Sequence, residues 1–215
     1  NYYSFNDKNT VPVVFIHGVG LTYEIWQPQL DFFKDYSTLS YDILGHGKSS
    51  LNIQEINFDD FSDQLINLIN ELKINKIHLI GFSIGSLIAR NFATKFNDRL
   101  QSLILLGSIY KRSEQQQKIV NERFNQAKKE LKLSKQALKR WFTDKYLKNN
   151  PDTFDKISSI LSSNNMEYFL KTYELFVNHK NDEDFEKIKV NTLLMTGEYD
   201  IGSTIEMSQE LNKVI

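Results

Sequence analysis

The chain alternates between short apolar runs and longer segments in which apolar residues recur every three or four positions. The short runs are rich in β-branched residues and predict buried strands at 11–16, 37–43, 76–81 and 102–107. The longer segments predict amphipathic helices at 24–36, 58–72 and 84–97. Strands that alternate with helices pair in parallel through right-handed crossovers, and helices then cover both faces of the sheet. The pattern therefore predicts an α/β fold with a mostly parallel, doubly wound sheet.

The alternation stops at Ile109 and resumes near residue 188. From about residue 111 to 187 every pattern is helical, and Asn150-Pro151 is typical of a helix N-cap followed by the first helical residue. A strand and a turn are then expected at 191–197. We therefore expect an α/β core in two pieces, residues 1–109 and 188–215, with a helical cap inserted at 110–187.

The segment Gly81-Phe82-Ser83-Ile84-Gly85 follows one predicted strand and opens a predicted helix. A serine in this position takes a strained backbone conformation, and the flanking glycines let the chain pass without Cβ clashes. Its hydroxyl then lies at a helix N-terminus, where free N–H groups receive negative charge. The pattern predicts that Ser83 is a nucleophile rather than part of an ordinary turn.

Composition narrows the classes of function. The chain has 215 residues and a formal net charge of −1, which gives no reason to expect a nucleic acid or an anionic membrane as partner. No apolar run approaches the ~20 residues of a membrane span. Because the chain has no cysteine, it has no disulfide, thiolate nucleophile or cysteine-ligated zinc. We expect a cytoplasmic protein that uses neither a cofactor nor a metal.

A nucleophilic serine also needs a base, an acid that orients the base, and two donors that stabilise the oxyanion. The backbone N–H of Ile84 is the natural first donor, because this residue follows the nucleophile. The second donor is expected from the loop after the first predicted strand. There, Val19 in His17-Gly18-Val19-Gly20 is the candidate.

Together these motifs resemble those of α/β-hydrolase-fold enzymes, in the branch of capped esterases and lactonases. The resemblance covers residues 11–211 and rests on four marks: His17-Gly18, the loop 42–49, the segment 81–85, and Gly197-Glu198-Tyr199-Asp200. Residues 138–143 and 195–198 are similar to those of 3-oxoadipate enol-lactonases and their relatives. The resemblance implies that Asp200 is the acid of a catalytic triad, whereas Asp42 only braces a loop.

The base of such a triad is not evident in the sequence. The resemblance implies a histidine after one further strand, but no histidine follows Asp200. Structural or surface roles are favoured for all four histidines, which are His17, His46, His78 and His179. Only His179 has any prospect of reaching Ser83. We therefore expect a nearly inactive fragment, cut at both ends, that lacks the C-terminal strand and helix. Residues 192–196 would then form an apolar, aggregation-prone edge of the sheet.

The expected function is hydrolysis of a small carboxylic ester or (enol-)lactone through an acyl-enzyme on Ser83. A cofactor-free perhydrolase and a carbon–carbon bond hydrolase share the same triad and stay open as alternatives, as does a non-catalytic relative that binds a small molecule. Serine rather than aspartate at position 83 argues against haloalkane dehalogenases and epoxide hydrolases. The aromatic residues of the cap either line a substrate cavity or, as we favour, mostly pack the cap's own core: Trp141, Phe142, Tyr146, Phe169 and Tyr173.

Overall fold

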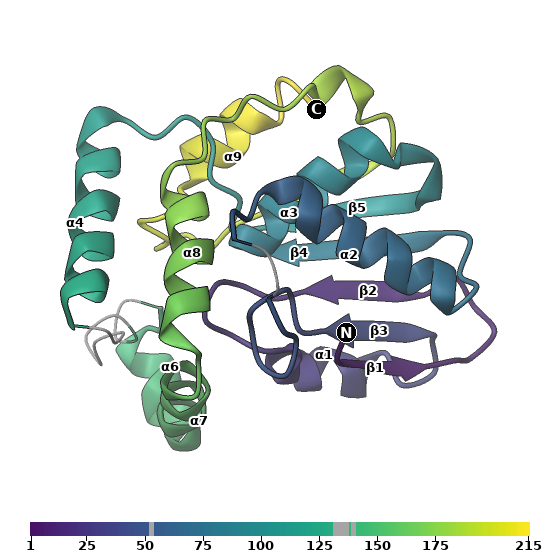
Figure 1. Ribbon diagram of the computed structural model, residues 1–215, viewed down its shortest axis with the longest axis horizontal. Helices are drawn as coiled ribbons and strands as arrows, with labels where there is room; N and C mark the ends of the chain where they lie inside the picture. Colours follow the sequence, from purple (N-terminus) through teal and green to yellow (C-terminus); the bar gives the residue numbers. More distant parts are fainter. Residues whose placement is uncertain (52–53, 131–137, 139–140) are drawn as a thin grey trace.

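The computed structural model describes residues 1–51, 54–130, 138 and 141–215. Its sheet has the strand order β1-β3-β2-β4-β5-β6 (Figure 1). The strands are β1 Tyr3–Asn6, β2 Val13–Ile16, β3 Thr38–Tyr41, β4 Ile77–Phe82, β5 Leu100–Leu106 and β6 Thr192–Met195. The helices are α1 Gln27–Phe32, α2 Phe58–Glu71, α3 Ile84–Lys95, α4 Glu114–Glu130, α6 Asp144–Asn149, α7 Pro151–Ser162, α8 Met166–Val177 and α9 Ile205–Leu211. Short 3₁₀ turns lie at Tyr23–Trp26, Asn97–Arg99 and Phe185–Lys187.

All neighbouring strands pair in parallel except β1, which pairs antiparallel with β3. The α/β class and the mostly parallel sheet predicted from the alternating pattern are thus confirmed. The sequence did not predict β1, which has only four residues and no buried side chain to mark it. Its place comes from the ladder with β3, extended by the bond from Asp42 N–H to the Tyr2 carbonyl.

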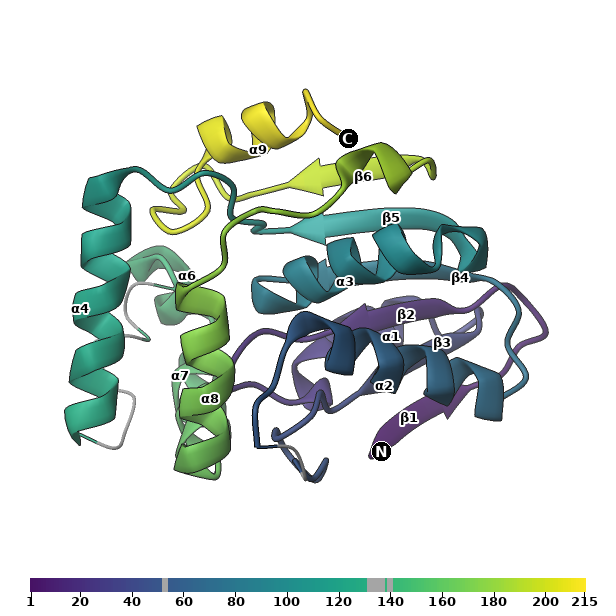
Figure 2. The same ribbon diagram turned by 45° about the horizontal axis from the view of Figure 1, so that its top comes forward.

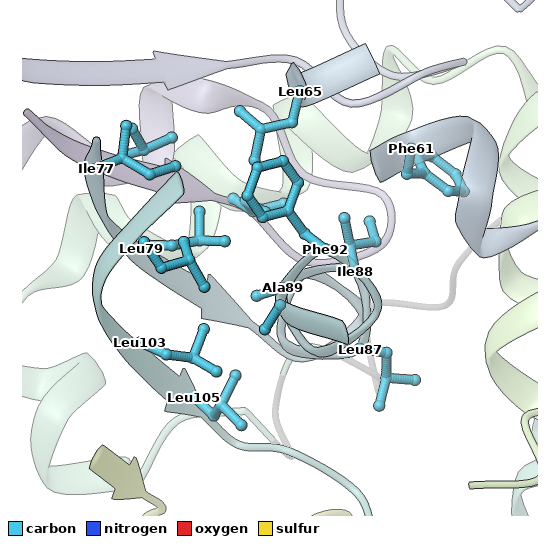
Figure 3. Close-up of a cluster of buried hydrophobic side chains, with 14 of the residues drawn as sticks. Phe61, Leu65, Ile77, Leu79, Leu87, Ile88, Ala89, Phe92, Leu103 and Leu105 are labelled. Atoms are coloured by element: carbon cyan, nitrogen blue, oxygen red, sulfur yellow. The ribbon is translucent and has the colours of Figure 1, made fainter. Parts of the chain in front are cut away.

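The main core lies between one face of the sheet and helices α2 and α3. Figure 3 shows Phe61 and Leu65 of α2 and Phe92 of α3 in one cluster of buried side chains with Leu79 and Leu103 of the central strands. All five side chains are fully buried. Burying a side chain of this size contributes about 1.5–3 kcal/mol, so this layer fixes the position of α3 against β4.

The opposite face is covered by the segment around α1, where Phe15 of β2 contacts Trp26 and Phe33. The single helix predicted at 24–36 is instead a 3₁₀ turn at Tyr23–Trp26 followed by α1. Pro28 in the first turn of α1 explains the break, because proline has no N–H to continue a preceding helix.

Helices α4, α6, α7 and α8 follow β5 and precede β6, and they lie beyond the carboxyl ends of the parallel strands (Figures 1 and 2). Asn150 and Pro151 begin α7 as expected. Part of the segment that resembles enol-lactonases (residues 139–140) lies outside the described residues. The division into a core and a cap stays a prediction. In the described part of the chain, no helix is long and apolar enough to cross a bilayer.

Strand β6 forms the last edge of the sheet, and two of its apolar side chains are about half exposed. Leu193 is 54% and Met195 50% exposed. An edge strand of this kind offers free N–H and C=O groups beside apolar surface, which favours pairing with another chain.

We therefore expect Leu193→Lys to reduce self-association of the 215-residue chain, because a charge on an edge strand opposes edge-to-edge pairing. Light scattering after size-exclusion chromatography measures the effect. Phe32→Lys is the matched control, since Phe32 is 80% exposed but lies on α1 rather than on a strand. A chain that is monomeric at high concentration without substitution would contradict the expectation.

Candidate active site

Ser83 forms the turn between β4 and α3 with φ 57° and ψ −120°. Residues held in such sparsely populated conformations cost of order 1–3 kcal/mol and persist only where surrounding contacts fix them. Here the Ser83 N–H donates to the Leu106 carbonyl of β5 at 2.9 Å. The Ser83 carbonyl accepts from the N–H of Ser86 at 2.9 Å and from its hydroxyl at 2.6 Å. The strained turn predicted from the sequence is present.

The glycines on either side of Ser83 are required by close backbone contacts. A Cβ at Gly81 would lie 2.2 Å from the Gly85 carbonyl oxygen. A Cβ at Gly85 would lie 2.5 Å from the Ile16 carbonyl oxygen and 2.7 Å from that of His17. Real Cβ atoms essentially never approach this closely. The first turn of α3 therefore packs directly on the ends of β4 and β2.

The same packing brings the loop after β2 beside the serine. A Cβ at Gly18 would lie 3.4 Å from the Ser83 Cβ, and Val19 lines the same cavity as Ser83. No described residue accepts a hydrogen bond from the Val19 N–H. The N–H of Ile84, the first residue of α3, has no acceptor within the helix. Both amides are thus available as oxyanion donors, and their catalytic role stays a prediction.

Asp200 lies in the turn after β6, and its carboxylate accepts three hydrogen bonds. Oδ1 accepts from the N–H of Gly202 at 2.8 Å and of Ser203 at 3.0 Å, and Oδ2 accepts from the Ser203 hydroxyl at 2.8 Å. A Cβ at Gly107, just after β5, would lie 3.7 Å from Oδ2. The carboxylate is therefore fixed at the end of the strand next to β4. Sequence reasoning missed Ser203, although a serine three residues after an aspartate is a common turn signal.

Asp42 braces a loop, as the resemblance implied. Its two oxygens accept from the N–H groups of Tyr23 and Lys48, both at 2.9 Å. A Cβ at Gly47 would lie 2.1 Å from Oδ2, so only glycine fits at this position of the loop. Burial raises the pKa of the Asp42 carboxyl, and the two backbone donors oppose this increase. Asp42 does not line the cavity that Ser83 faces.

Two of the four histidines are buried supports of the loops around the site. His17 Nε2 accepts from the Ile43 N–H at 3.1 Å, and Nδ1 donates to the Gly18 carbonyl at 2.8 Å. Burial lowers the pKa of His17 to about 3 and that of His46 to about 4, so both rings are neutral near pH 7. Their ring centroids are 5.5 Å apart.

The other two histidines are also engaged away from Ser83. The Nδ1 atom of His78 in β4 lies 2.7 Å from the hydroxyl oxygen of Ser102. The His179 Nε2 lies 3.2 Å from Glu183 Oε1, and its ring packs edge-on against Phe58. None of the four lines the cavity that Ser83 faces. The structure thus brings Ser83, Asp200 and Val19 to one cavity without a histidine.

This cavity has a volume of about 840 Å³ and lies between the strand ends and the helices α4, α6, α7 and α8. Its lining is largely apolar. All five aromatic residues singled out in the sequence line it: Trp141, Phe142, Tyr146, Phe169 and Tyr173. The ring centroids of Phe169 and Tyr173 are also 5.6 Å apart. These residues therefore both line the cavity and pack against each other. No cluster of three potential metal ligands occurs among the residues whose placement is described.

A family model described as the alpha/beta hydrolase fold matches residues 11–215. The chain belongs to this family. The resemblance that the sequence motifs indicated is thereby confirmed, and the arrangement of β2, β4 and α3 around Ser83 is that of an α/β hydrolase.

Two relatives of this α/β hydrolase come from Acinetobacter baylyi. One is named (E)-2-((N-methylformamido)methylene)succinate hydrolase and is 29% identical over 96% of this chain and 79% of its own length. The other, 3-oxoadipate enol-lactonase 2, is 24% identical over 98% of this chain and 79% of its own length. The names of these relatives support the conclusion that this chain is a hydrolase.

Solved structures show the same fold. The enol-lactonase from Burkholderia xenovorans LB400 superimposes with a TM-score of 0.90 at 23% identity, over 100% of this chain and 84% of that one. A thermophilic esterase from Thermogutta terrifontis gives a TM-score of 0.84 at 23% identity, over 99% of this chain and 81% of that one.

We expect Gly85→Ala to lower the free energy of unfolding by about 2–3 kcal/mol, because the added methyl group meets the backbone of β2. Urea denaturation measures the loss. Gly197→Ala is the control, since its nearest contacts would be 3.9 Å away and its loss should stay within about 0.5 kcal/mol. Equal losses for the two variants would show that the contact at Gly85 is not tight.

The buried histidines predict that this α/β hydrolase loses stability as the pH falls below about 6.5. The unfolded chain takes up a proton on His17 near that pH, whereas the folded chain does so only near pH 3. Stability is therefore fully present above pH 6.5 and falls by roughly 2 kcal/mol for this residue between pH 7 and 5. Urea denaturation at the two pH values measures this difference, and His17→Gln should reduce it by about that amount. An unchanged difference in the variant would contradict the assignment.

Proposed function

We propose that this α/β hydrolase cleaves a small carboxylic ester or lactone through an acyl-enzyme on Ser83. The observation that carries the proposal is the strained Ser83 turn, which faces a cavity of about 840 Å³ together with Asp200 and Val19. The cavity's largely apolar lining suits a small organic ester.

In this mechanism the Ser83 Oγ attacks the carbonyl carbon of the substrate while a base takes its proton. The carbonyl oxygen becomes an oxyanion, which accepts hydrogen bonds from the N–H groups of Ile84 and Val19; each such donor contributes about 3 kcal/mol. Collapse of this intermediate breaks the bond to the alcohol oxygen, which takes the proton from the base. Water, activated by the same base, then hydrolyses the acyl group from Ser83.

Asp200 would orient the base and stabilise its charged form. The three donors on its carboxylate fix the direction in which it can accept a further hydrogen bond. None of the chain's four histidines is among the residues that line the cavity, which supports the proposal that these 215 residues lack the base. Loss of the histidine from a comparable triad costs on the order of 10⁶ in turnover. We therefore expect the 215-residue chain by itself to be nearly inactive.

A perhydrolase stays a second candidate, and one relative favours keeping it. Non-heme chloroperoxidase CPO-A1 from Kitasatospora aureofaciens is 37% identical over 101 residues, which is 46% of this chain. In that alternative, hydrogen peroxide rather than water would release the acyl group from Ser83 as a peracid. No specific observation favours the other two alternatives, a carbon–carbon bond hydrolase and a non-catalytic relative that binds a small molecule.

The test is rescue by imidazole. The 215-residue chain should release p-nitrophenol from p-nitrophenyl acetate close to the background rate, and imidazole in solution should raise its rate above that of imidazole alone. Ser83→Ala is the control, because it removes the nucleophile and should abolish the enhancement. Asp200→Asn should leave most of it, since free imidazole needs no orienting acid.

Two results would count against the proposal, and a third measurement distinguishes the second candidate. An enhancement that survives Ser83→Ala would show that Ser83 is not the nucleophile. Enzyme-like rates without imidazole would show that another group of this chain serves as base. Hydrogen peroxide added to the rescued reaction competes with water for the acyl group, and a perhydrolase would then form peracid faster than acid.

A further inference from the structure

The turn between α7 and α8 is bonded to the loop that follows β2. In this turn, the Asn164 Nδ2 donates to the Gly20 carbonyl at 2.7 Å, across 144 positions of sequence. The same nitrogen lies 3.2 Å and 3.1 Å from the carbonyl oxygens of Ile160 and Leu161 at the end of α7. Because three oxygens surround this nitrogen, the direction of the side-chain amide is fixed. Asn164 is therefore a donor that is held by one helix and directed at a loop of the sheet.

Apolar contacts hold the same turn against Gly20. A Cβ at Gly20 would lie 2.8 Å from Leu161 Cδ2 and 3.0 Å from Phe169 Cε2. Leu161 and Phe169 are both buried. Gly20 also has a φ of +76°, which residues other than glycine rarely adopt. The distance between the loop after β2 and the helices α7 and α8 is thus set by direct contact at Gly20.

The Gly20 carbonyl is connected to the Val19 N–H through a chain of peptide groups. The Gly20 C=O and the Leu21 N–H belong to one peptide group and point in opposite directions, since peptide bonds are planar and almost always trans. The Leu21 N–H donates to the Gly18 carbonyl at 3.2 Å. The Gly18 C=O shares the next peptide group with the Val19 N–H. A donor on the Gly20 carbonyl therefore helps to orient the Val19 amide.

This chain of hydrogen bonds is supported at both ends. His17 Nδ1 donates to the Gly18 carbonyl at 2.8 Å from the side of the sheet, whereas Asn164 donates to the Gly20 carbonyl from the helices. Hydrogen bonds in such a chain polarise one another, so a donor at one end strengthens the donor at the other. The last donor is the Val19 N–H, for which the described chain supplies no acceptor. It is therefore free to bind an oxygen of a substrate.

We propose that Asn164 is a positioning residue for hydrolysis at Ser83. Its side-chain amide holds the Val19 N–H in the direction in which this amide donates to the oxyanion. The helices α7 and α8 then support catalysis as well as enclosing the cavity. This inference rests on the proposed function for the reaction, whereas the hydrogen bonds themselves can be measured without turnover.

The test compares Asn164→Leu with a matched substitution in the same helical segment. Leucine has nearly the shape of asparagine but no donor, so it removes the bond to Gly20 without opening a cavity. Asn150→Leu is the control. The Asn150 Nδ2 also donates to the end of a helix, the Tyr146 carbonyl of α6 at 3.0 Å, but it makes no hydrogen bond to the sheet or its loops in the described part of the chain.

The first measurement is imidazole-rescued hydrolysis of p-nitrophenyl acetate. Loss of an oxyanion donor costs about 10²–10³ in kcat, and a misdirected donor costs less. We therefore expect Asn164→Leu to lower kcat about tenfold and to leave KM within about twofold, since the oxyanion forms only after binding. Asn164→Gln keeps an amide donor and should restore most of kcat. Asn150→Leu should change neither constant by more than about twofold.

The second measurement is amide NMR, which requires no turnover. Asn164→Leu should shift the ¹H–¹⁵N resonances of Val19 and Leu21 and accelerate hydrogen exchange at Leu21, and Asn150→Leu should do neither. Circular dichroism establishes that each variant is folded. If Asn164→Leu does not fold, Asn164→Ser takes its place with the same expected results, because the serine hydroxyl is too short to reach the Gly20 carbonyl.

Three results would overturn the positioning role: a fall in kcat no larger than that of Asn150→Leu, a rise in KM without a fall in kcat, or unchanged resonances of Val19 and Leu21. Failure of the proposed function gives a different pattern. The unsubstituted chain would then show no Ser83-dependent rescue, while Asn164→Leu would still shift both resonances. In that case Asn164 would fix the loop without positioning an oxyanion donor, and the inference would fail together with the function.

Discussion

The contact between the first turn of α3 and the ends of β4 and β2 is the constraint on which the rest of the site depends. Gly81 and Gly85 allow this contact because any Cβ there would overlap a backbone carbonyl. With α3 fixed at this distance by its buried face, Ser83 takes a φ of 57°, in the left-handed region that favours glycine. The strain at Ser83 is thus maintained by the packing of the core rather than by local preference.

The parallel order of the sheet then determines what can lie near Ser83. Strand β2 is on one side of β4 and β5 on the other, so the loops that follow these strands meet at the same end of the sheet. The loop after β2 brings Val19, and the turn after β6 brings Asp200 against Gly107 at the end of β5. Residues separated by more than 100 positions are therefore brought to one cavity by strand order.

A buried ion pair fixes the point where the chain returns from the helices to the sheet. Arg90 on α3 is fully buried and contacts Glu183 at 2.7 Å, and it also donates to the Ile109 carbonyl at 2.8 Å. Arg90 thus connects the helix that carries Ser83 to both ends of the helical segment. Burial lowers the pKa of Arg90, and the Glu183 charge opposes this change. Removing one partner of such a pair is strongly destabilising, because it leaves the other charge buried and uncompensated.

The sequence by itself determined the α/β class and the strained turn at Ser83, because each depends on local periodicity or on glycines at fixed spacing. The loop brace at Asp42 followed from the family resemblance. The sequence missed β1, whose four residues have no pattern of their own and are held only by pairing with β3. It also missed Ser203, whose hydroxyl donates to the Asp200 carboxylate, because the sequence does not show which side chain a turn aspartate accepts from. The tertiary structure decided that aromatic residues of the helical segment line a cavity as well as contact one another, since side chains on one helix face do both only when another layer lies opposite them.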